Sequence, residues 1–147
     1  MAHVSHIWTS PGKSSGRMDG HDGATVLESH GLEGCAHGGR SAKRQILFAS
    51  AEHLRSVGVE PGAIRENFTV EGVDVHTWPV GARVRVGETE FEITEECEPC
   101  HKMDALRPGL RAELEHRRGM LASVVRGGDV AVGDEVELVA GQLDLAS

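Results

Sequence analysis

The feature that most limits the fold of this chain is a strict alternation of apolar and charged residues on both sides of Gly87-Glu88. If these two residues form a type II′ turn, with glycine in the first position, the flanking segments pair as an antiparallel hairpin. Apolar pairs then occupy one face and ion pairs the other, and a slip of one residue would break both sets. The sequence therefore predicts a half-buried sheet with a fixed register. The expected pairs are Arg83–Glu92, Val84–Phe91 and Arg85–Glu90.

Further strands are predicted by short apolar runs that glycine-containing turns separate. The remainder of 1–43 is rich in Gly, Ser and His, so we expect much of this segment, and of 1–25 in particular, to be loop. The apolar runs cover 4–8, 25–27, 45–48, 121–125, 130–132 and 136–138.

Two helices are predicted. Ser50 is placed to cap a short helix over 51–57, which Gly58 would end. Leucines that recur every four residues predict a second helix of about three turns, which would end at Gly119. Glu113 and Arg117 are spaced on it for an i,i+4 ion pair. The leucines are Leu106, Leu110 and Leu114.

Strands outnumber helices in this pattern and do not alternate with them, which is typical of mainly β folds rather than of parallel α/β folds. We therefore expect a mainly β, barrel-like domain with one or two packed α-helices. The chain has 147 residues, of which 39% are hydrophobic, and this is enough for a single domain over 1–147 without disulfides or metal staples.

The acidic charge balance limits the partners of this chain. The formal net charge is −8, whereas nucleic acids and anionic membranes are bound by basic surfaces. The first residues lack a basic n-region followed by an apolar stretch, and no apolar run approaches the ~20 residues of a membrane span. We expect a cytoplasmic protein that binds neither nucleic acid nor a membrane and captures any anion in a local pocket.

The cysteines are the strongest candidates for chemistry. Three of them, an odd number, are better explained as thiols than as a disulfide framework. Pro99 has a fixed φ and so aims Cys100 from a stiff turn, where a thiolate can ligate a soft metal or carry sulfur. We predict Cys100 as the functional thiol. Cys97, three residues earlier, is either a resolving thiol or an incidental neighbour.

Two upstream segments are candidates for binding an anion. Gly38-Gly39 and the basic residues after it can form a backbone nest around a phosphate, or a glycine turn with a solvated basic edge. Arg65 and Asn67 are two residues apart, so in an extended segment both face one side and Glu66 faces away. Such a pair can bind a phosphate or organise a turn, and the residues alone do not separate these roles.

Two rival functions follow from the cysteine spacing. Cys97-x-x-Cys100-His101 matches the attachment pattern of c-type haem, with His101 as one axial ligand and Met103 or Met120 as the other. That interpretation lacks the export signal and the helical surroundings that haem attachment usually requires. A structural zinc site is the second rival. Its ligands would be Cys35, His37, Cys97 and Cys100.

An ordered series of motifs resembles the MOSC domain, the C-terminal domain of molybdenum cofactor sulfurases, which also exists as small stand-alone proteins. The resemblance covers nearly the whole chain, although its first motif has Gly34-Cys35 where the family usually has Gly-Asp. The matching segments are 31–40, with its His-Gly-Gly-Arg, 61–74, with its Arg-Glu-Asn, Gly81, Gly87, Pro99-Cys100 and 122–136.

The resemblance implies a MOSC-type β-barrel and a molybdenum cofactor, a molybdopterin, held with Cys100 as metal ligand or sulfur carrier. It allows either a molybdenum-dependent oxidoreductase that reduces N-hydroxylated compounds or a sulfur-transfer protein, with a redox or sulfur-donor protein as partner. The desulfurase domain of the fused sulfurases is absent, so we expect no pyridoxal phosphate in this chain. The implied cofactor-binding residues are His37, Gly38, Gly39, Arg40, Arg44, Arg65, Asn67 and Thr69.

Overall fold

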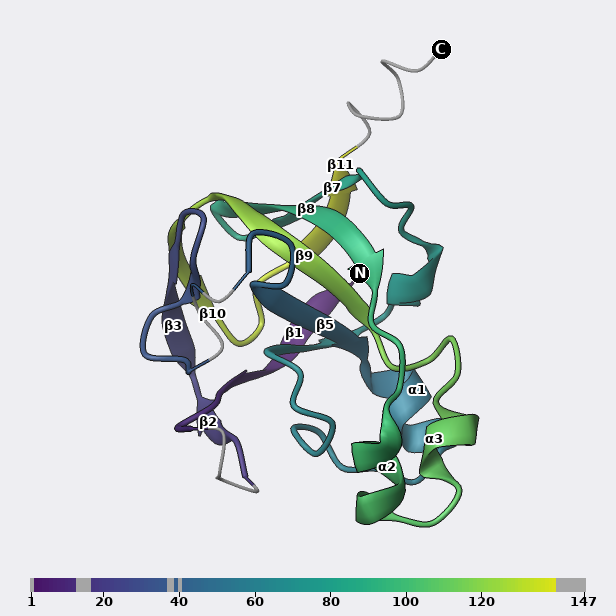
Figure 1. Ribbon diagram of the computed structural model, residues 1–147. Helices are drawn as coiled ribbons and strands as arrows, with labels where there is room; N and C mark the ends of the chain where they lie inside the picture. Colours follow the sequence, from purple (N-terminus) through teal and green to yellow (C-terminus); the bar gives the residue numbers. More distant parts are fainter. Residues whose placement is uncertain (1, 13–16, 37–38, 40, 140–147) are drawn as a thin grey trace.

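The computed structural model describes residues 2–12, 17–36, 39 and 41–139 (Figure 1). Its helices are α1 (Ala51–Ser56), the 3-10 turn η1 (Val75–Thr77), α2 (His101–Leu106) and α3 (Leu110–Glu113). Its strands are β1 (His3–Thr9), β2 (Asp19–His21), β3 (Gly23–Leu27), β4 (Gly31–Leu32), β5 (Ile46–Ser50), β6 (Phe68–Glu71), β7 (Arg83–Val86), β8 (Thr89–Glu96), β9 (Met120–Arg126), β10 (Gly128–Ala131) and β11 (Val136–Val139).

The described residues form a mainly β fold, as the sequence predicts. Eight strands are ordered β11-β7-β8-β9-β5-β6-β1-β2, and a smaller sheet is ordered β10-β3-β4. The expected barrel closure is wrong for these strands, because β11 and β2 lie at opposite ends of the larger sheet. Backbone bonds of Val4 with Gly133 and Asp134 nevertheless bring β1 against the turn before β11. The sheet is therefore strongly curved but open.

The hairpin of β7 and β8 has the predicted register, with Arg83 opposite Glu92 and Val84 opposite Phe91. Gly87 has a φ of +56°, in the region that favours glycine, as the first position of a type II′ turn requires. Val84 and Phe91 are fully buried, and Arg83 contacts Glu92 across the strands at 3.5 Å. The alternating sequence pattern is thus sufficient to fix this part of the sheet.

The first 43 residues contain more strand than the sequence predicts. β2 pairs with β1, and β3 pairs with β4 and with β10, so this segment contributes to both sheets. The strands predicted over 4–8 and 25–27 are present as β1 and β3, whereas β2 and β4 were not predicted and gain their hydrogen bonds from β1 and β3. Their local sequence, rich in glycine and polar residues, carries only a weak strand signal.

The helix α1 begins where expected and ends at Ser56, one residue before the predicted end, but Ser50 does not cap it. The Ser50 hydroxyl instead donates to the Val73 carbonyl and accepts from the Val75 N–H, each at 2.9 Å. These bonds hold the loop after β6 against the end of β5. The Ser50 side chain therefore bonds to this loop and does not cap α1, which is the role that the sequence alone predicts for it.

The predicted helix over 106–118 is wrong, because it is divided into α2 and α3 around Pro108. Arg107 has φ −160° and ψ 131°, the extended conformation that a following proline favours. Leu106 is consequently 51% exposed, whereas Leu110 and Leu114 are buried. Glu113 forms its close ion pair with Arg107, at 3.0 Å.

The described core has two large parts and a small third cluster of Leu47, Cys97 and Leu121, and the candidate site is lined by residues of all three. A cluster of aromatic rings fills the curved sheet, with Phe48 in contact with Phe68, Trp78 and Phe91. A second apolar cluster lies among the three helices, which gather at one end of the sheet (Figure 1). The second cluster comprises Ala49, Leu54, Val57, Ile64, Met103, Leu110 and Leu114.

A buried carboxyl group joins the turn at 61–65 to β6. Glu66 is 0% exposed, and its Oε2 accepts from the Gly62 N–H at 2.8 Å and from the Thr69 hydroxyl at 2.7 Å. Burial raises the pKa of this carboxyl, although these hydrogen bonds act against the shift. Glu66 therefore fixes the backbone that carries Arg65.

We predict that Glu66→Ala lowers the free energy of unfolding by about 2 kcal/mol or more, because two buried donors lose their acceptor. Glu60→Ala, at an exposed carboxyl of the same turn region, should change it by less than about 0.5 kcal/mol. Urea unfolding of both variants measures the difference. Equal stabilities would show that Glu66 does not hold this turn.

Candidate functional site

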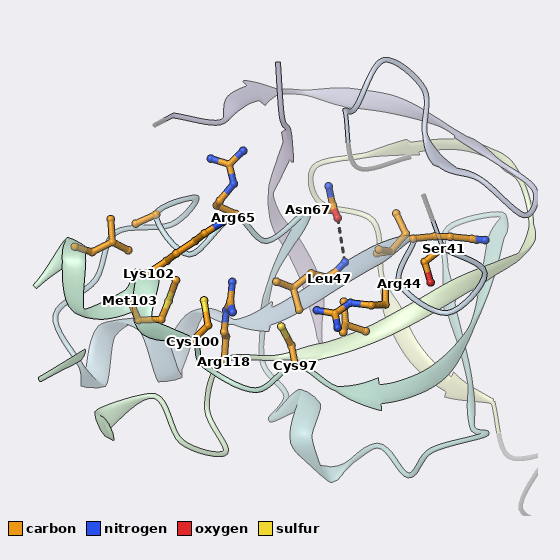
Figure 2. Close-up of a pocket in the computed structure, with 15 residues that line it drawn as sticks. Ser41, Arg44, Leu47, Arg65, Asn67, Cys97, Cys100, Lys102, Met103 and Arg118 are labelled. Atoms are coloured by element: carbon orange, nitrogen blue, oxygen red, sulfur yellow. Dashed lines mark hydrogen bonds between the residues drawn. The ribbon is translucent and has the colours of Figure 1, made fainter. Parts of the chain in front are cut away.

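A pocket of about 590 Å³ lies between the helical end of the molecule and the strands β5 and β9 (Figure 2). It is the place where segments far apart in the sequence bring the predicted thiol and several basic residues together. Its described lining consists of Ser41, Arg44, Gln45, Ile46, Leu47, Ala63, Arg65, Asn67, Cys97, Cys100, Lys102, Met103, Leu106, Arg118 and Leu121.

The pocket is basic although the chain is acidic. Four cationic side chains line it, and none of its described lining residues is acidic. Since the whole chain carries a formal charge of −8, this concentration of positive charge is local. Such a pocket favours an anion, because the charges act together on whatever enters it. The four cations are Arg44, Arg65, Lys102 and Arg118.

Cys100 lies partly exposed in this pocket, directly before α2. Burial acts to raise its pKa, but the backbone N–H of Lys102 and the charges of Arg118 and Lys102 outweigh burial, so the pKa is lowered. A lowered pKa increases the fraction of thiolate, which is both the nucleophilic form and the metal-binding form. The structure therefore makes Cys100 an accessible and acidic thiol.

Cys97 has the opposite properties. It is only 3% exposed and packs against Leu47 and Leu121. Burial raises the pKa of its thiol, and the charges of Arg118 and Arg44 compensate only in part. The pKa values of the two neighbouring thiols are therefore shifted in opposite directions, and Cys97 is suited to packing rather than to nucleophilic attack.

Arg118 connects the two segments that form the reactive side of the pocket. Its guanidinium donates to the carbonyl of Glu98 at 3.2 Å and to the carbonyl of Ile64 at 3.3 Å. Figure 2 shows its side chain beside the thiols of Cys97 and Cys100. One side chain thus holds the cysteine segment and the segment of Arg65 at a common position.

Arg65 lines the pocket, but the extended conformation predicted for 65–67 is wrong. Its φ is +68°, in the left-handed region, so Arg65 and Asn67 do not project as neighbours along one face of a strand. Glu66 is not among the lining residues, in agreement with the prediction that it faces away from Arg65 and Asn67, and it is buried. The guanidinium of Arg65 donates to the Ser10 hydroxyl at 2.6 Å.

Asn67 and Thr69 are held by the protein itself. The Asn67 amide accepts from the Leu47 N–H at 3.0 Å and donates to the Trp8 carbonyl at 3.2 Å (Figure 2 shows the first of these bonds). Asn67 borders the pocket, whereas Thr69 is fully buried outside it, between Trp8 and Glu66. These polar groups therefore join β5, β6 and β1.

The glycine-rich segment is only partly described. His37, Gly38 and Arg40, which the resemblance assigns to cofactor binding, lie outside the described residues. Gly39 borders a smaller neighbouring pocket of about 410 Å³, which shares Ser41 and Gln45 with the larger one. Arg44 lines the larger pocket and pairs with Glu95 at 3.5 Å.

Several residues of the pocket escaped the sequence analysis. Lys102 follows the cysteine motif directly and was available as a signal, because it is a basic residue two positions after Cys100. Nothing in the sequence indicated that Arg118 lines a pocket, because it lies at the end of the predicted helix, where the direction of its side chain could not be derived. The described residues contain no group of three His, Cys, Asp or Glu side chains suited to a metal ion. Cys35 does not line the pocket, and its sulfur accepts from the Ser10 N–H at 3.3 Å and from the Asn67 amide at 3.6 Å.

Similarity to known proteins agrees with this fold. The family model of the MOSC domain matches residues 33–137. The crystal structure of the YuaD protein from Bacillus subtilis superimposes with a TM-score of 0.78 at 21% identity, over 93% of this chain and 94% of that one. YiiM from Geobacillus stearothermophilus superimposes with a TM-score of 0.74 at 17% identity, over 95% of this chain and 75% of that one. No curated protein matches the sequence.

The chain therefore belongs to the MOSC domain family, in agreement with the resemblance seen in its motifs. This family is associated with molybdenum cofactor sulfurases, and the assignment does not favour the haem or zinc alternatives. In the part of the chain that is described, no helix is long and apolar enough to cross a membrane.

We predict that Cys100 is alkylated by iodoacetamide with a midpoint clearly below the ~8.5 of an ordinary thiol, because nearby positive charge favours the thiolate. Cys97 and Cys35 should react slowly at every pH, since both are buried. Mass spectrometry after timed alkylation measures each site separately. A midpoint for Cys100 at or above that of a free thiol would contradict this description.

Proposed function

We propose that this protein binds a molybdenum cofactor in the basic pocket, with the Cys100 thiolate as a ligand of the metal. The observation that carries the proposal is the position of an acidic, partly exposed thiol among four cationic side chains in a chain of the MOSC family. A thiolate is a soft ligand, and guanidinium and ammonium groups are suited to phosphate.

The residues of the pocket fit such a group chemically. Molybdenum is a metal that thiolates bind well, and a phosphorylated pterin presents the negative charge that the lining lacks. The apolar part of the lining, with Leu47, Met103 and Leu121, offers a surface for a flat ring system. The pocket therefore contains a separate surface for each chemical part of the cofactor.

The cofactor, when bound, would supply the redox chemistry of the metal, and the protein would orient it. Arg118 would hold the Cys100 segment in place and keep its thiol ionised. Arg65, Arg44 and Lys102 would neutralise the anionic part of the ligand. We propose that the resulting reaction is the reduction of N-hydroxylated compounds, in a cytoplasmic setting and with a separate redox protein as the electron donor.

Sulfur transfer is a second candidate function, and the partial exposure of Cys100 favours it, because a partner can reach this thiol. In this route the Cys100 thiolate would attack the terminal sulfur of a persulfide on a donor protein. The donor's S–S bond breaks, its own sulfur leaves as a thiolate, and Cys100 keeps the transferred sulfur as a persulfide. This route needs no pyridoxal phosphate in this chain.

We predict that protein produced in a host that makes molybdenum cofactor contains molybdenum and pterin, and that Cys100→Ser lowers the molybdenum content at least tenfold. A hydroxyl is nearly isosteric with the thiol but is a poor ligand for a soft metal. Cys97→Ser is the matched control and should retain most of the metal. Metal analysis and pterin fluorescence after oxidation measure both, and wild-type protein without either component would refute the proposal.

We also predict that Arg65→Ala lowers pterin retention severalfold while changing the melting temperature by only a few degrees. Alanine leaves the strained backbone as it is and removes the guanidinium from the pocket. Arg85→Ala, on β7 and outside the pocket, should leave pterin content unchanged. A large loss of stability with undiminished pterin would mean that Arg65 is a structural residue.

A further inference from the structure

The backbone N–H and carbonyl of Gly119 both form hydrogen bonds, and the residue lies beside the segments that carry Arg118 and Cys97. Its carbonyl accepts from the Cys97 N–H at 3.0 Å, and its own N–H donates to Nε2 of His76 at 2.9 Å. Gly119 directly follows Arg118 in the chain. The imidazole of His76 therefore holds the backbone that carries Arg118 and the start of the cysteine segment.

There is also no space for a side chain at Gly119. A Cβ atom at this position would collide with the carbonyl oxygen of Phe48 in β5, and the φ of +139° favours glycine as well. The residue is thus confined between β5, β8 and η1. Any change in the bond to His76 must move the backbone of Gly119 or leave its N–H without a partner.

His76 can accept this hydrogen bond only while its Nε2 carries no proton, because a doubly protonated imidazole has only donors. Burial lowers the pKa of His76, and its neighbours act in both directions. Glu96 and Asp74 raise the pKa, whereas His53 and His116 lower it further. His53 contacts Asp74 at 3.5 Å, and His116 contacts Glu96 at 3.0 Å.

The lowered pKa of His76 determines how its contribution to the stability of the fold depends on pH. Because the pKa is lowered in the folded protein, the bond of His76 stabilises the fold fully above the ordinary histidine value of 6.5. The contribution is lost as the pH falls below this value toward the lower pKa of the folded state. At neutral pH the bond to Gly119 is therefore fully formed.

We propose that His76 is a positioning residue for the basic pocket, which holds Arg118 and Cys97 in place through Gly119 and releases them when its Nε2 is protonated. Anion binding would then weaken reversibly in mild acid. The inference deepens the proposed function, since it rests on the pocket being an anion site. His76 does not itself line the pocket, so it acts through Gly119 rather than through contact with a ligand.

Two physical effects oppose each other when His76 is protonated. The added positive charge would strengthen anion binding by simple attraction, whereas the loss of the hydrogen bond would displace Arg118 and weaken it. Glu96 and Asp74 lie close to His76 and offset much of its charge. We therefore expect the displacement of Arg118 to outweigh the added charge. The anion affinity should then fall about fivefold, an effect typical of one hydrogen bond.

Sulfate is a suitable probe, because it remains a dianion over the whole range from pH 8 to pH 4.5. Amide NMR spectra of the full chain report two quantities in one titration. The Gly119 amide resonance follows its bond to His76, and the resonances of Arg118 and Cys100 give the dissociation constant for sulfate. We expect the Gly119 resonance to shift and the dissociation constant to rise about fivefold in the same pH interval.

His76→Gln separates position from protonation, because glutamine can accept the Gly119 N–H through its amide oxygen but does not titrate. We expect this variant to bind sulfate as wild type does at pH 7.5 and to lose the fivefold weakening in acid. His76→Leu, which has no acceptor, should bind about fivefold more weakly at pH 7.5. His21→Gln, on β2, is the control and should keep the full pH dependence of wild type.

The outcomes distinguish this inference from the proposed function. Sulfate binding that has the same pH dependence in wild type and His76→Gln would overturn the role of His76 and leave the anion pocket intact. Sulfate binding that strengthens in acid in wild type alone would also overturn it, because charge rather than position would then dominate. Wild type that does not bind sulfate at pH 7.5 would overturn both the inference and the proposed function.

Discussion

The guanidinium of Arg118 is the interaction on which the candidate site depends. It donates to the carbonyls of Glu98 and Ile64, which belong to segments more than thirty residues apart in the chain. The first segment carries Cys100, and the second carries Arg65. Because backbone carbonyls rather than carboxylates accept these bonds, the positive charge of Arg118 is not neutralised by an ion pair. The same charge lowers the pKa of Cys100.

The charge distribution of the site follows from this arrangement. Among the described residues, several arginines outside the pocket form ion pairs, as Arg83 does with Glu90 and Arg85 with Glu137. Such ion pairs contribute little to stability, but in each of them the carboxylate offsets the positive charge of the arginine. None of the described lining residues of the pocket is acidic, and Arg44 is the lining cation that pairs with a carboxylate outside it, Glu95 at 3.5 Å. An acidic protein can thereby contain a pocket whose described lining is positively charged.

The sequence predicted those parts of the fold that depend on local pattern. The register of β7 and β8 was predictable because Val84–Phe91 and Arg83–Glu92 can be satisfied in only one alignment. The helix over 106–118 was not, because regular leucine spacing was given more weight than Pro108, which disfavours helix at Arg107. The left-handed conformation of Arg65 was not predicted either, because it accompanies the burial of Glu66 and its bonds to Gly62 and Thr69, and the polar local sequence gave no sign of that burial.

The sequence also predicted only some of the residues of the candidate site. Cys100 was identified from its place after Pro99, and the family motifs indicated Arg65 and Arg44. Arg118 and the tether of Gly119 to His76 could not be found, because Arg118 bonds to the carbonyls of Glu98 and Ile64, and Gly119 is held by η1 and β5. No local pattern encodes these contacts. Sequence patterns thus predicted the thiol that the pocket contains, whereas the residues that surround and position it became visible only in the fold.

The most direct test of the central claim is molybdenum X-ray absorption of protein purified from a host that makes the cofactor. If the Cys100 thiolate is a ligand of the metal, the spectrum of wild type should contain sulfur scattering that is absent from Cys100→Ser reconstituted with the same cofactor, and Cys97→Ser should resemble wild type. Identical spectra for wild type and Cys100→Ser would show that this thiol does not bind the metal and would contradict the account.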